Sequence, residues 1–365
     1  MAAELPITGL TAAAYKIPTD APEADGTLAW HATTLVVVEV EAGSGKGLGY
    51  TYADASLVPL IGKTIAGLVD GMDAAAPQSV WQAMQDGLRN LGRDGLAATA
   101  VSAVDAAVWD VKARALDLPL YRLLGTYRTE VPIYGSGGFT SYDDAKLRDQ
   151  LGRWVTETGC GAVKMKIGTD PARDPHRMAV ARAAIGTADL FIDANGAFAR
   201  KPALAFAELA TTFGVKWFEE PVSSDDLEGL REVRARAPAM MEIAAGEYGY
   251  DPDYFRRMLA AGAVDVLQAD ASRCGGITGF LKAAILAEAF QTDLSGHCAP
   301  ALHLHAACAA PRLRHLEWFH DHVRIEHMLF DGAPRPRNGL LLPDPARPGS
   351  GLDFKRQDAL RFKVA

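Results

Sequence analysis

The sequence has few cysteines, no long apolar run and no concentration of basic residues. No apolar run approaches about 18 residues, so we expect no membrane-spanning segment. The N-terminus has no basic stretch followed by an apolar one, so we expect no signal peptide. The cysteines show no CxxC or framework spacing, which is typical of reduced core thiols and predicts a cytoplasmic protein; they are Cys160, Cys274, Cys298 and Cys308.

The charge balance is acidic, with a formal net charge of −8 and no basic block. This balance argues against nucleic acid as a partner. An acidic surface also repels free anions, so an anionic substrate would need local cations, either lysines or a metal ion. Hydrophobic residues at 49% and charged residues at 22% are typical of a globular enzyme.

The 365 residues are enough for a (β/α)8 barrel of about 250 residues and a smaller module. Residues 1–130 predict an α+β capping domain, because strand patterns at Thr33–Glu41 and Leu48–Tyr52 precede a long helical pattern at Ala97–Leu116. Residues 131–334 predict a modified (β/α)8 TIM-type barrel. Residues 335–365, with a strand-like Leu352–Phe362, predict a segment that returns to the capping domain.

The barrel prediction depends on short apolar runs that alternate with amphipathic segments. The eight predicted strands are Val131–Ser136, Ala162–Ile167, Leu190–Asn195, Lys216–Pro221, Met241–Glu247, Val264–Asp270, Asp293–Cys298 and His315–Phe319.

Two lysines, Lys164 and Lys166, lie two residues apart in the second predicted strand. Because side chains alternate along a strand, both point to the same face. If that face is buried, desolvation and mutual repulsion both favour the neutral amine, and a lysine pKa lowered from about 10.4 to about 7–8 gives a usable general base. The alternative is an exposed edge strand with two solvated lysines.

Acidic residues lie at or near the ends of the next three strands: Asp193, Glu219 and Glu247. Catalytic residues of barrel enzymes come from these C-terminal ends. A single carboxylate there is more often a hydrogen-bonded or capping group, but three on successive strands need a counter-ion. Three carboxylates with open coordination positions suit Mg²⁺, so we predict these residues as its ligands.

Asp270 and His297 lie on consecutive predicted strands, which stand about 4.8 Å apart. An aspartate that accepts a hydrogen bond from one imidazole nitrogen fixes the tautomer and raises the basicity of the other nitrogen. The pair therefore predicts a second base across the barrel from Lys166. The alternative is a histidine that only satisfies the core. The eighth strand carries Glu317.

As an ordered set, these motifs resemble the enolase superfamily, and within it the mandelate racemase group, over the whole chain. Muconate-cycloisomerase-like and dipeptide-epimerase-like relatives have a lysine five residues before a Gly-Gly pair. This chain has Asp270 at that position, which argues against those two activities. Enolase itself uses no Lys-x-Lys motif, so the chain does not resemble enolase proper. The matching motifs are Val163–Gly168, Ile192–Asn195, Phe218–Pro221, Gly246–Glu247, Asp270 with Gly275–Gly276, Gly296–His297 and Leu316–Glu317.

The resemblance implies a role for each residue. Mg²⁺ on the three carboxylates would chelate the substrate carboxylate. Lys166 would remove the proton α to it, and Lys164 would neutralise the carboxylate and lower the pKa of Lys166. His297, oriented by its aspartate, would be acid or base on the opposite face. Glu317, as a protonated acid, would donate a hydrogen bond to the enediolate, and Asn195 would contact the substrate or a metal-bound water.

The resemblance also implies two lid loops, Tyr15–His31 and Gly47–Asp54. Their candidate substrate contacts are Trp30, His31, Tyr50 and Tyr52. The alternative is that these aromatic residues only pack between domains. Four further histidines are interpreted as ordinary residues of the barrel rim, because the metal already has oxygen ligands: His303, His305, His320 and His322.

Together these features predict a Mg²⁺-dependent enzyme acting on a small carboxylate. With a β-hydroxyl on the substrate, a hydro-lyase reaction would dehydrate a sugar acid (an aldonate or aldarate), which we favour because members of the group are more often acid-sugar dehydratases. Without a leaving group, a 2-hydroxy acid would be racemised or epimerised. A non-catalytic barrel is a remote alternative, since no base or ligand is missing. The resemblance also implies a homo-oligomer.

Overall fold

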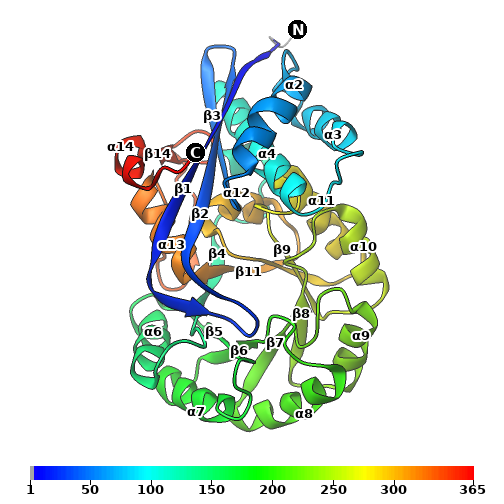
Figure 1. The fold of residues 1–365 in the computed structure, drawn as a ribbon, viewed down its shortest axis with the longest axis vertical. Helices are drawn as coiled ribbons and strands as arrows, with labels where there is room; N and C mark the ends of the chain where they lie inside the picture. Colours follow the sequence, from blue (N-terminus) through cyan, green and yellow to red (C-terminus); the bar gives the residue numbers. More distant parts are fainter. Residues whose placement is uncertain (1–3) are drawn as a thin grey trace.

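The computed structural model describes residues 4–365, and it consists of a capping module above a barrel (Figure 1). Residues 1–3, where the predicted capping domain begins, lie outside the described residues. The chain starts with an antiparallel sheet of β1 (Ile7–Ala24), β2 (Ala29–Ala42) and β3 (Gly45–Tyr52). The capping helices are α1 (Leu57–Pro59), a π-helix (Leu60–Ile65), α2 (Ala66–Val69), α3 (Pro77–Gly87), α4 (Leu96–Ala115) and α5 (Leu120–Leu124).

The capping sheet packs directly on α4, and two glycines of β3 allow it. A Cβ added to Gly47 would lie 2.0 Å from the carbonyl oxygen of Ala107, and one added to Gly49 would lie 2.0 Å from that of Ala103. Only glycine permits so close an approach of strand and helix backbones. These glycines therefore let the capping sheet and α4 pack backbone to backbone.

The barrel is closed and parallel, as predicted, because its last strand pairs back onto its first. All eight predicted strands form, each with ends within two residues of those expected. They are β4 (Val131–Gly137), β5 (Ala162–Lys166), β6 (Asp189–Asp193), β7 (Val215–Glu219), β8 (Glu242–Ala245), β9 (Val266–Ala269), β10 (Asp293–Gly296) and β11 (Leu313–Phe319).

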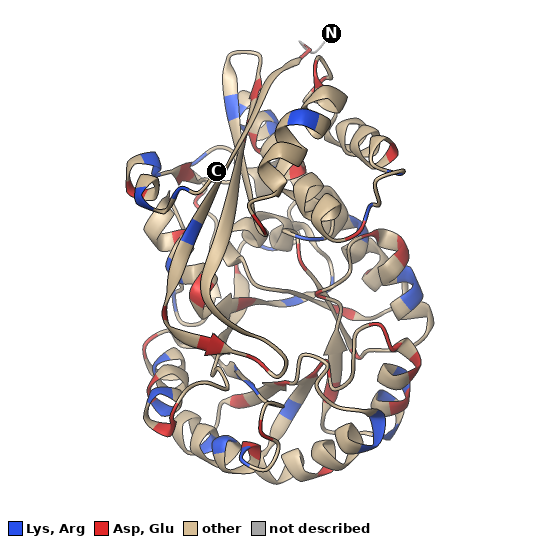
Figure 2. Cartoon of the chain, viewed as in Figure 1, with Lys and Arg blue, Asp and Glu red and all other residues tan. Residues whose placement is uncertain are grey.

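Helices cover the outside of the barrel, and charges of both signs are distributed along them (Figure 2). Among the described residues, no helix has the length and apolar character needed to cross a lipid bilayer. The outer helices are α6 (Asp144–Thr156), α7 (Asp174–Ile185), α8 (Arg200–Ala210), α9 (Leu227–Arg236), α10 (Pro252–Ala260), α11 (Gly276–Ala289), α12 (Pro300–Ala309) and α13 (His320–Leu329).

Aromatic side chains fill the barrel interior beneath its mouth. Tyr134, Phe191 and Trp217 come from three different strands and pack together, with ring centroids 5.2–6.3 Å apart. Two residues further along their strands, Asp193 and Glu219 point to the same face, because side chains alternate with a period of two. The sequence thus places an ionisable layer directly on an apolar one.

The C-terminal segment differs from its predicted conformation. Within the predicted strand Leu352–Phe362, only β14 (Asp353–Phe354) is strand, and it pairs with β12 (Phe330–Asp331). Arg356–Phe362 is helical and comprises α14 (Arg356–Ala359) and a 3-10 turn. Good helix formers dominate this run. The last residues of the chain lie beside β1, where Ala14 accepts a backbone hydrogen bond from Val364 and donates one to Ala365. A short β13 (Leu340–Leu341) pairs with β4.

The two predicted lid loops are also mostly strand. The first forms the distal half of the β1–β2 hairpin, which reaches over the barrel mouth (Figure 1). Its turn is closed by Asp25, whose Oδ1 accepts hydrogen bonds from the backbone N–H groups of Thr27 and Leu28 at 2.6 and 2.7 Å. The second is largely β3, which pairs with β2 along its whole length. Strand pairing in the capping sheet therefore extends to within a few residues of the site.

Candidate active site

A cavity of about 260 Å³ lies between the barrel mouth and the tip of the β1–β2 hairpin. The barrel contributes residues from strand ends and the loops that follow them, and the hairpin contributes the opposite wall. The lining residues are Asp25, Leu28, Trp30, Ala32, Thr33, Lys166, Asn195, Glu247, Tyr248, Arg273, His297, Cys298, Phe319 and His322.

The three predicted metal ligands lie together at the ends of successive strands. One carboxylate oxygen from each of Asp193, Glu219 and Glu247 lies within 4.8 Å of the other two, and all three side chains are buried. Parallel pairing sets this arrangement, since Asp193 is in register with Glu219 on the next strand. Glu247 Oε2 has no hydrogen bond from the described residues. Buried carboxylate oxygens without enough hydrogen-bond donors around them fit a hard divalent cation such as Mg²⁺.

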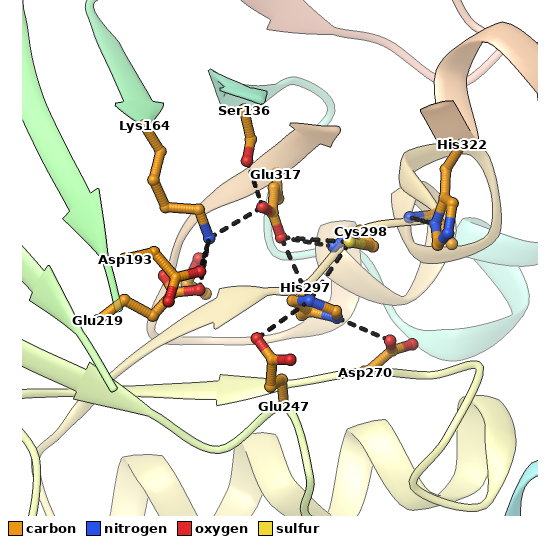
Figure 3. A network of polar contacts seen from close by, with 12 residues as sticks. Ser136, Lys164, Asp193, Glu219, Glu247, Asp270, His297, Cys298, Glu317 and His322 are labelled. Carbon is orange, nitrogen blue, oxygen red and sulfur yellow. Dashed lines mark hydrogen bonds and ion pairs between the residues drawn. The ribbon is translucent and has the colours of Figure 1, made fainter. Parts of the chain in front are cut away.

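Both lysines of β5 are buried and point into this cluster, so the exposed-edge alternative is wrong (Figure 3 shows Lys164). Lys166 Nζ donates to Asp193 Oδ2 at 2.5 Å. Lys164 Nζ donates to Glu219 and lies 2.9 Å from Glu317 Oε1. The two ammonium groups are thus counter-ions of Asp193 and Glu219.

This pairing changes the expected ionisation of Lys166. Burial lowers its pKa, and the charge of Lys164 lowers it further, as predicted. The carboxylate of Asp193, helped by Glu247 and Glu219, outweighs both effects and leaves the pKa raised. The lowered pKa that the sequence predicts for Lys166 is therefore not found, because the neighbouring carboxylates stabilise its charged form.

His297 and Asp270 form the predicted pair. His297 Nδ1 lies 2.8 Å from Asp270 Oδ2, while the backbone N–H of Ser272 donates to Asp270 Oδ1 at 2.7 Å. The other ring nitrogen, Nε2, faces Glu247 Oε2 at 3.2 Å (Figure 3). Burial lowers the pKa of His297, but the surrounding acidic groups raise it well above its ordinary value.

Glu317 lies between the two halves of the site. Its carboxylate accepts hydrogen bonds from Ser136 Oγ at 2.5 Å and from the backbone N–H of Cys298 at 2.9 Å. Burial raises its pKa, but Lys164 and His297 lower it well below the ordinary value. This lowered pKa opposes the role implied by the resemblance, in which a protonated Glu317 donates a hydrogen bond.

The candidate substrate contacts separate into two groups. Trp30 and Asn195 line the cavity. Tyr50 does not: it is 1% exposed, its hydroxyl donates to Glu326 Oε1 at 2.6 Å, and its ring stacks on Phe330. His31 is exposed on β2 and is not among the lining residues. For Tyr50, packing between the capping module and α13 is therefore the correct interpretation.

Two of the four other histidines, His303 and His305, satisfy backbone groups. His303 accepts from the backbone N–H of Ala271 at 2.7 Å, and His305 accepts from that of Tyr121 at 3.1 Å. His322 differs, because it lines the cavity and stacks on Tyr52 with ring centroids 3.5 Å apart.

Sequence reasoning missed several cavity residues, among them Arg273. Its Nε lies 3.5 Å from Asp270 Oδ2 and its Nη1 lies 3.4 Å from Glu247 Oε1, so it bridges the histidine pair and the carboxylate cluster. Its guanidinium also lies over the ring of Tyr248. The one sequence signal for Arg273 was its position, three residues after Asp270 in the turn that follows β9.

Family comparison covers both parts of the chain. Residues 146–359 match the family described as enolase C-terminal domain-like, and residues 11–125 match the N-terminal domain of mandelate racemase / muconate lactonizing enzyme. A 3,6-anhydro-alpha-L-galactonate cycloisomerase of Streptomyces coelicolor is 33% identical over 88% of this chain and 90% of its own length. An L-talarate/galactarate dehydratase of Salmonella typhimurium is 34% identical over 71% of this chain and 67% of its own.

Solved structures agree with this assignment. A mandelate racemase/muconate lactonizing enzyme-like protein of Rubrobacter xylanophilus is 50% identical, with a TM-score of 0.96 over 98% of this chain and all of its own. A racemase of Streptomyces coelicolor with bound magnesium is 31% identical, with a TM-score of 0.92 over 98% of this chain and all of its own. Mg²⁺ is the cofactor of this superfamily. The chain belongs to the enolase superfamily, in its mandelate racemase group.

Proposed function

We propose that this protein is a Mg²⁺-dependent dehydratase of a sugar acid, an aldonate or aldarate. The observation that carries the proposal is one cavity lined by two separate bases, Lys166 and His297, beside a cluster of three buried carboxylates. The bases come from β5 and β10, which are separated by β4 and β11 on one side of the barrel and by β6 to β9 on the other. Such placement lets them act on two faces of a bound molecule.

Asp193, Glu219 and Glu247 would hold Mg²⁺, which supplies Lewis-acid stabilisation of a substrate carboxylate. Lys166 would accept the α-proton, and the electrons of that C–H bond would move into the carboxylate to give an enediolate. Lys164 would donate a hydrogen bond to the charge that develops on its oxygens.

In the second half of the reaction, His297 would act as an acid. Its imidazolium proton would pass to the β-hydroxyl as the C–O bond breaks, releasing water and leaving an enol that takes up a proton at the β-carbon to become a 2-keto acid. Asp270 would keep the imidazole in the productive tautomer throughout. The relatives named as acting on galactonate derivatives and galactarate support a sugar acid as the substrate.

Racemisation or epimerisation of a 2-hydroxy acid is the second candidate, favoured by the same pair of bases. If the substrate has no β-leaving group, His297 would return a proton to the α-carbon on the face opposite Lys166. The similar Streptomyces protein named a racemase supports this outcome.

We further propose that residues 131–334 supply the chemistry, residues 1–130 the specificity, and residues 335–365 the attachment between them, in a cytoplasmic homo-oligomer.

A screen of sugar acids and 2-hydroxy acids with Mg²⁺ in D₂O tests the proposal. Semicarbazide detects 2-keto acids, and NMR detects deuterium at the α-carbon. Formation of a keto acid is the expected result, and it identifies the substrate. Deuterium incorporation without keto acid would replace the dehydratase assignment with racemase or epimerase. A new product without deuterium at the α-carbon and without keto acid would overturn both.

A further inference from the structure

A second group of candidate metal ligands lies outside the active-site cavity. It is found where the distal half of the β1–β2 hairpin, called the lid below, meets the barrel. One ligand atom from each of Asp20, Glu23 and His320 lies within 4.8 Å of the other two. Asp20 and Glu23 belong to the distal part of β1, close to the hairpin turn, whereas His320 is the first residue of α13, directly after β11. The group therefore draws its members from both sides of the lid–barrel contact.

Glu23 is buried without a full set of hydrogen bonds. Its side chain is 1% exposed, and its Oε2 accepts a hydrogen bond from Trp30 Nε1 at 2.8 Å. Its Oε1 has no hydrogen-bond partner among residues 4–365. A buried carboxylate oxygen with no donor costs free energy, and a carboxylate oxygen of Glu23 lies within 4.8 Å of ligand atoms of Asp20 and His320. The Glu23 carboxylate therefore has an open ligand position beside these two residues.

The other two members are reachable from solvent. The side chains of Asp20 and His320 are 44% and 24% exposed, and His320 Nε2 lies 3.1 Å from Asp20 Oδ2. A cation could therefore enter from outside and take up the oxygen of Glu23 behind them. The contact between Asp20 and His320 shows that the lid and barrel sides already approach to ligand distance.

An irregularity in β1 brings the two acidic residues together. On a regular strand, residues three apart point to opposite faces. Pairing is in register at Pro18 with Ala32 and resumes at Glu23 with Trp30, so five steps along β1 oppose two along β2. Bulges of this kind re-aim side chains, and here Asp20 and Glu23 turn toward the same side.

We propose that Asp20, Glu23 and His320 form a second divalent-cation site that fastens the lid to the barrel. One imidazole nitrogen and two carboxylate oxygens suit a borderline cation such as Zn²⁺ or Co²⁺ better than Mg²⁺, which prefers oxygen alone. Because Glu23 also holds the indole of Trp30, which lines the active-site cavity, an ion here would restrain the wall of that cavity.

Binding of Co²⁺ under saturating Mg²⁺ tests the site, with stoichiometry read by calorimetry and by the visible absorption of Co²⁺. We expect the wild-type protein to bind one more Co²⁺ per chain than Asp20→Asn or His320→Asn. The matched control is His176→Asn, because His176 pairs with Asp144 at 2.6 Å on an exposed surface and belongs to no three-ligand group among residues 4–365. Melting temperatures without added Co²⁺ check that all variants are folded.

Equal stoichiometry in all four proteins would overturn the site, and an equal loss in His176→Asn would show nonspecific binding to surface histidines. Hydrogen exchange of residues 19–28 tests the fastening. Exchange should slow when Co²⁺ binds the wild-type protein and should not change in His320→Asn. A bound ion that leaves exchange in this segment unchanged would overturn the lid-fastening role. Neither measurement depends on turnover, so both stand apart from the proposed reaction.

Discussion

Single residues in the cavity take their ionisation from neighbours on other strands. Lys166 shows this most clearly, because burial and Lys164 lower its pKa while Asp193, Glu247 and Glu219 together raise it by more. The sequence showed the two lysines on one face but not the carboxylate facing them, since that contact depends on β5 pairing in register with β6. The sequence therefore identified the two lysines, but the charges around them could be known only from the closed barrel.

The two bases should be separable by substitution. We expect Lys166→Ala and His297→Asn each to lower turnover by about 10²–10⁴-fold, because each removes one proton-transfer group. Circular dichroism should show an unchanged fold. In D₂O, each variant should still exchange the α-proton of those substrate stereoisomers that present it to the remaining base. Exchange of the same stereoisomers at the same rate in both variants would contradict the two-face assignment, and His176→Asn serves as a neutral control.

Asp270→Asn should act as a weaker form of the His297 lesion. The amide keeps the shape of Asp270 and can still accept from Ser272, but it no longer favours the productive imidazole tautomer. We expect a loss of about 10–100-fold in turnover, in keeping with other groups that orient a functional histidine. Comparing kcat and KM of Asp270→Asn with those of His297→Asn checks this prediction. Wild-type kinetics in Asp270→Asn would show that Asp270 does not orient His297.

At the level of elements, regular repetition was predictable and local irregularity was not. The eight barrel strands have apolar runs bounded by helical segments, and all were located from that pattern. The tip of the β1–β2 hairpin has a register shift between Pro18 and Glu23, which disrupts the alternation that marks a strand. Tyr50 was misplaced for a related reason, because its side of β3 meets α13, and its hydrogen-bond partner Glu326 lies 276 residues away in the chain.

The contact between β3 and α13 should make stability depend on pH. Burial raises the pKa of Glu326 to about 8, against an ordinary value of 4.5, although hydrogen bonds from Tyr50 and Ala301 lower it. The native state therefore keeps this proton up to about pH 8, while the unfolded chain releases it near pH 4.5. Its contribution to stability is complete below pH 4.5 and is lost as pH rises toward 8.

Thermal unfolding of Glu326→Gln between pH 5 and 8 checks this assignment. The amide cannot ionise, so the melting temperature of the variant should fall less over this range than that of the wild-type protein. Glu288→Gln is the control, since Glu288 is exposed on α11. Parallel pH profiles for the wild-type protein and Glu326→Gln would show that Glu326 does not carry the effect.

At the level of the whole molecule, the cavity exists only where separate parts of the chain meet. Lys166 and His297 come from the barrel, whereas Leu28 and Trp30 come from a hairpin near the N-terminus. The last residues of the chain pair with Ala14 of β1, the strand that carries one side of this hairpin. Substrate selectivity could not be read from the sequence, since it depends on how the hairpin docks over the barrel.

The same assembly concentrates negative charge at one point, which makes the whole fold sensitive to the cation. Mg²⁺ binding to the native state alone should raise its free energy of unfolding by about 2.7 kcal/mol at a concentration of about 100 times Kd. We therefore expect chelation to abolish activity and lower the melting temperature, with both restored by Mg²⁺.

Asp193→Asn should remove the Mg²⁺-dependent rise in melting temperature, because it removes one of the three ligands. Asp149→Asn, at a side chain that is 69% exposed on α6, should keep it. A melting temperature and an activity that both survive exhaustive chelation would show that the three carboxylates need no Mg²⁺, and that ion pairs such as Lys164–Glu219 and Lys166–Asp193 are enough.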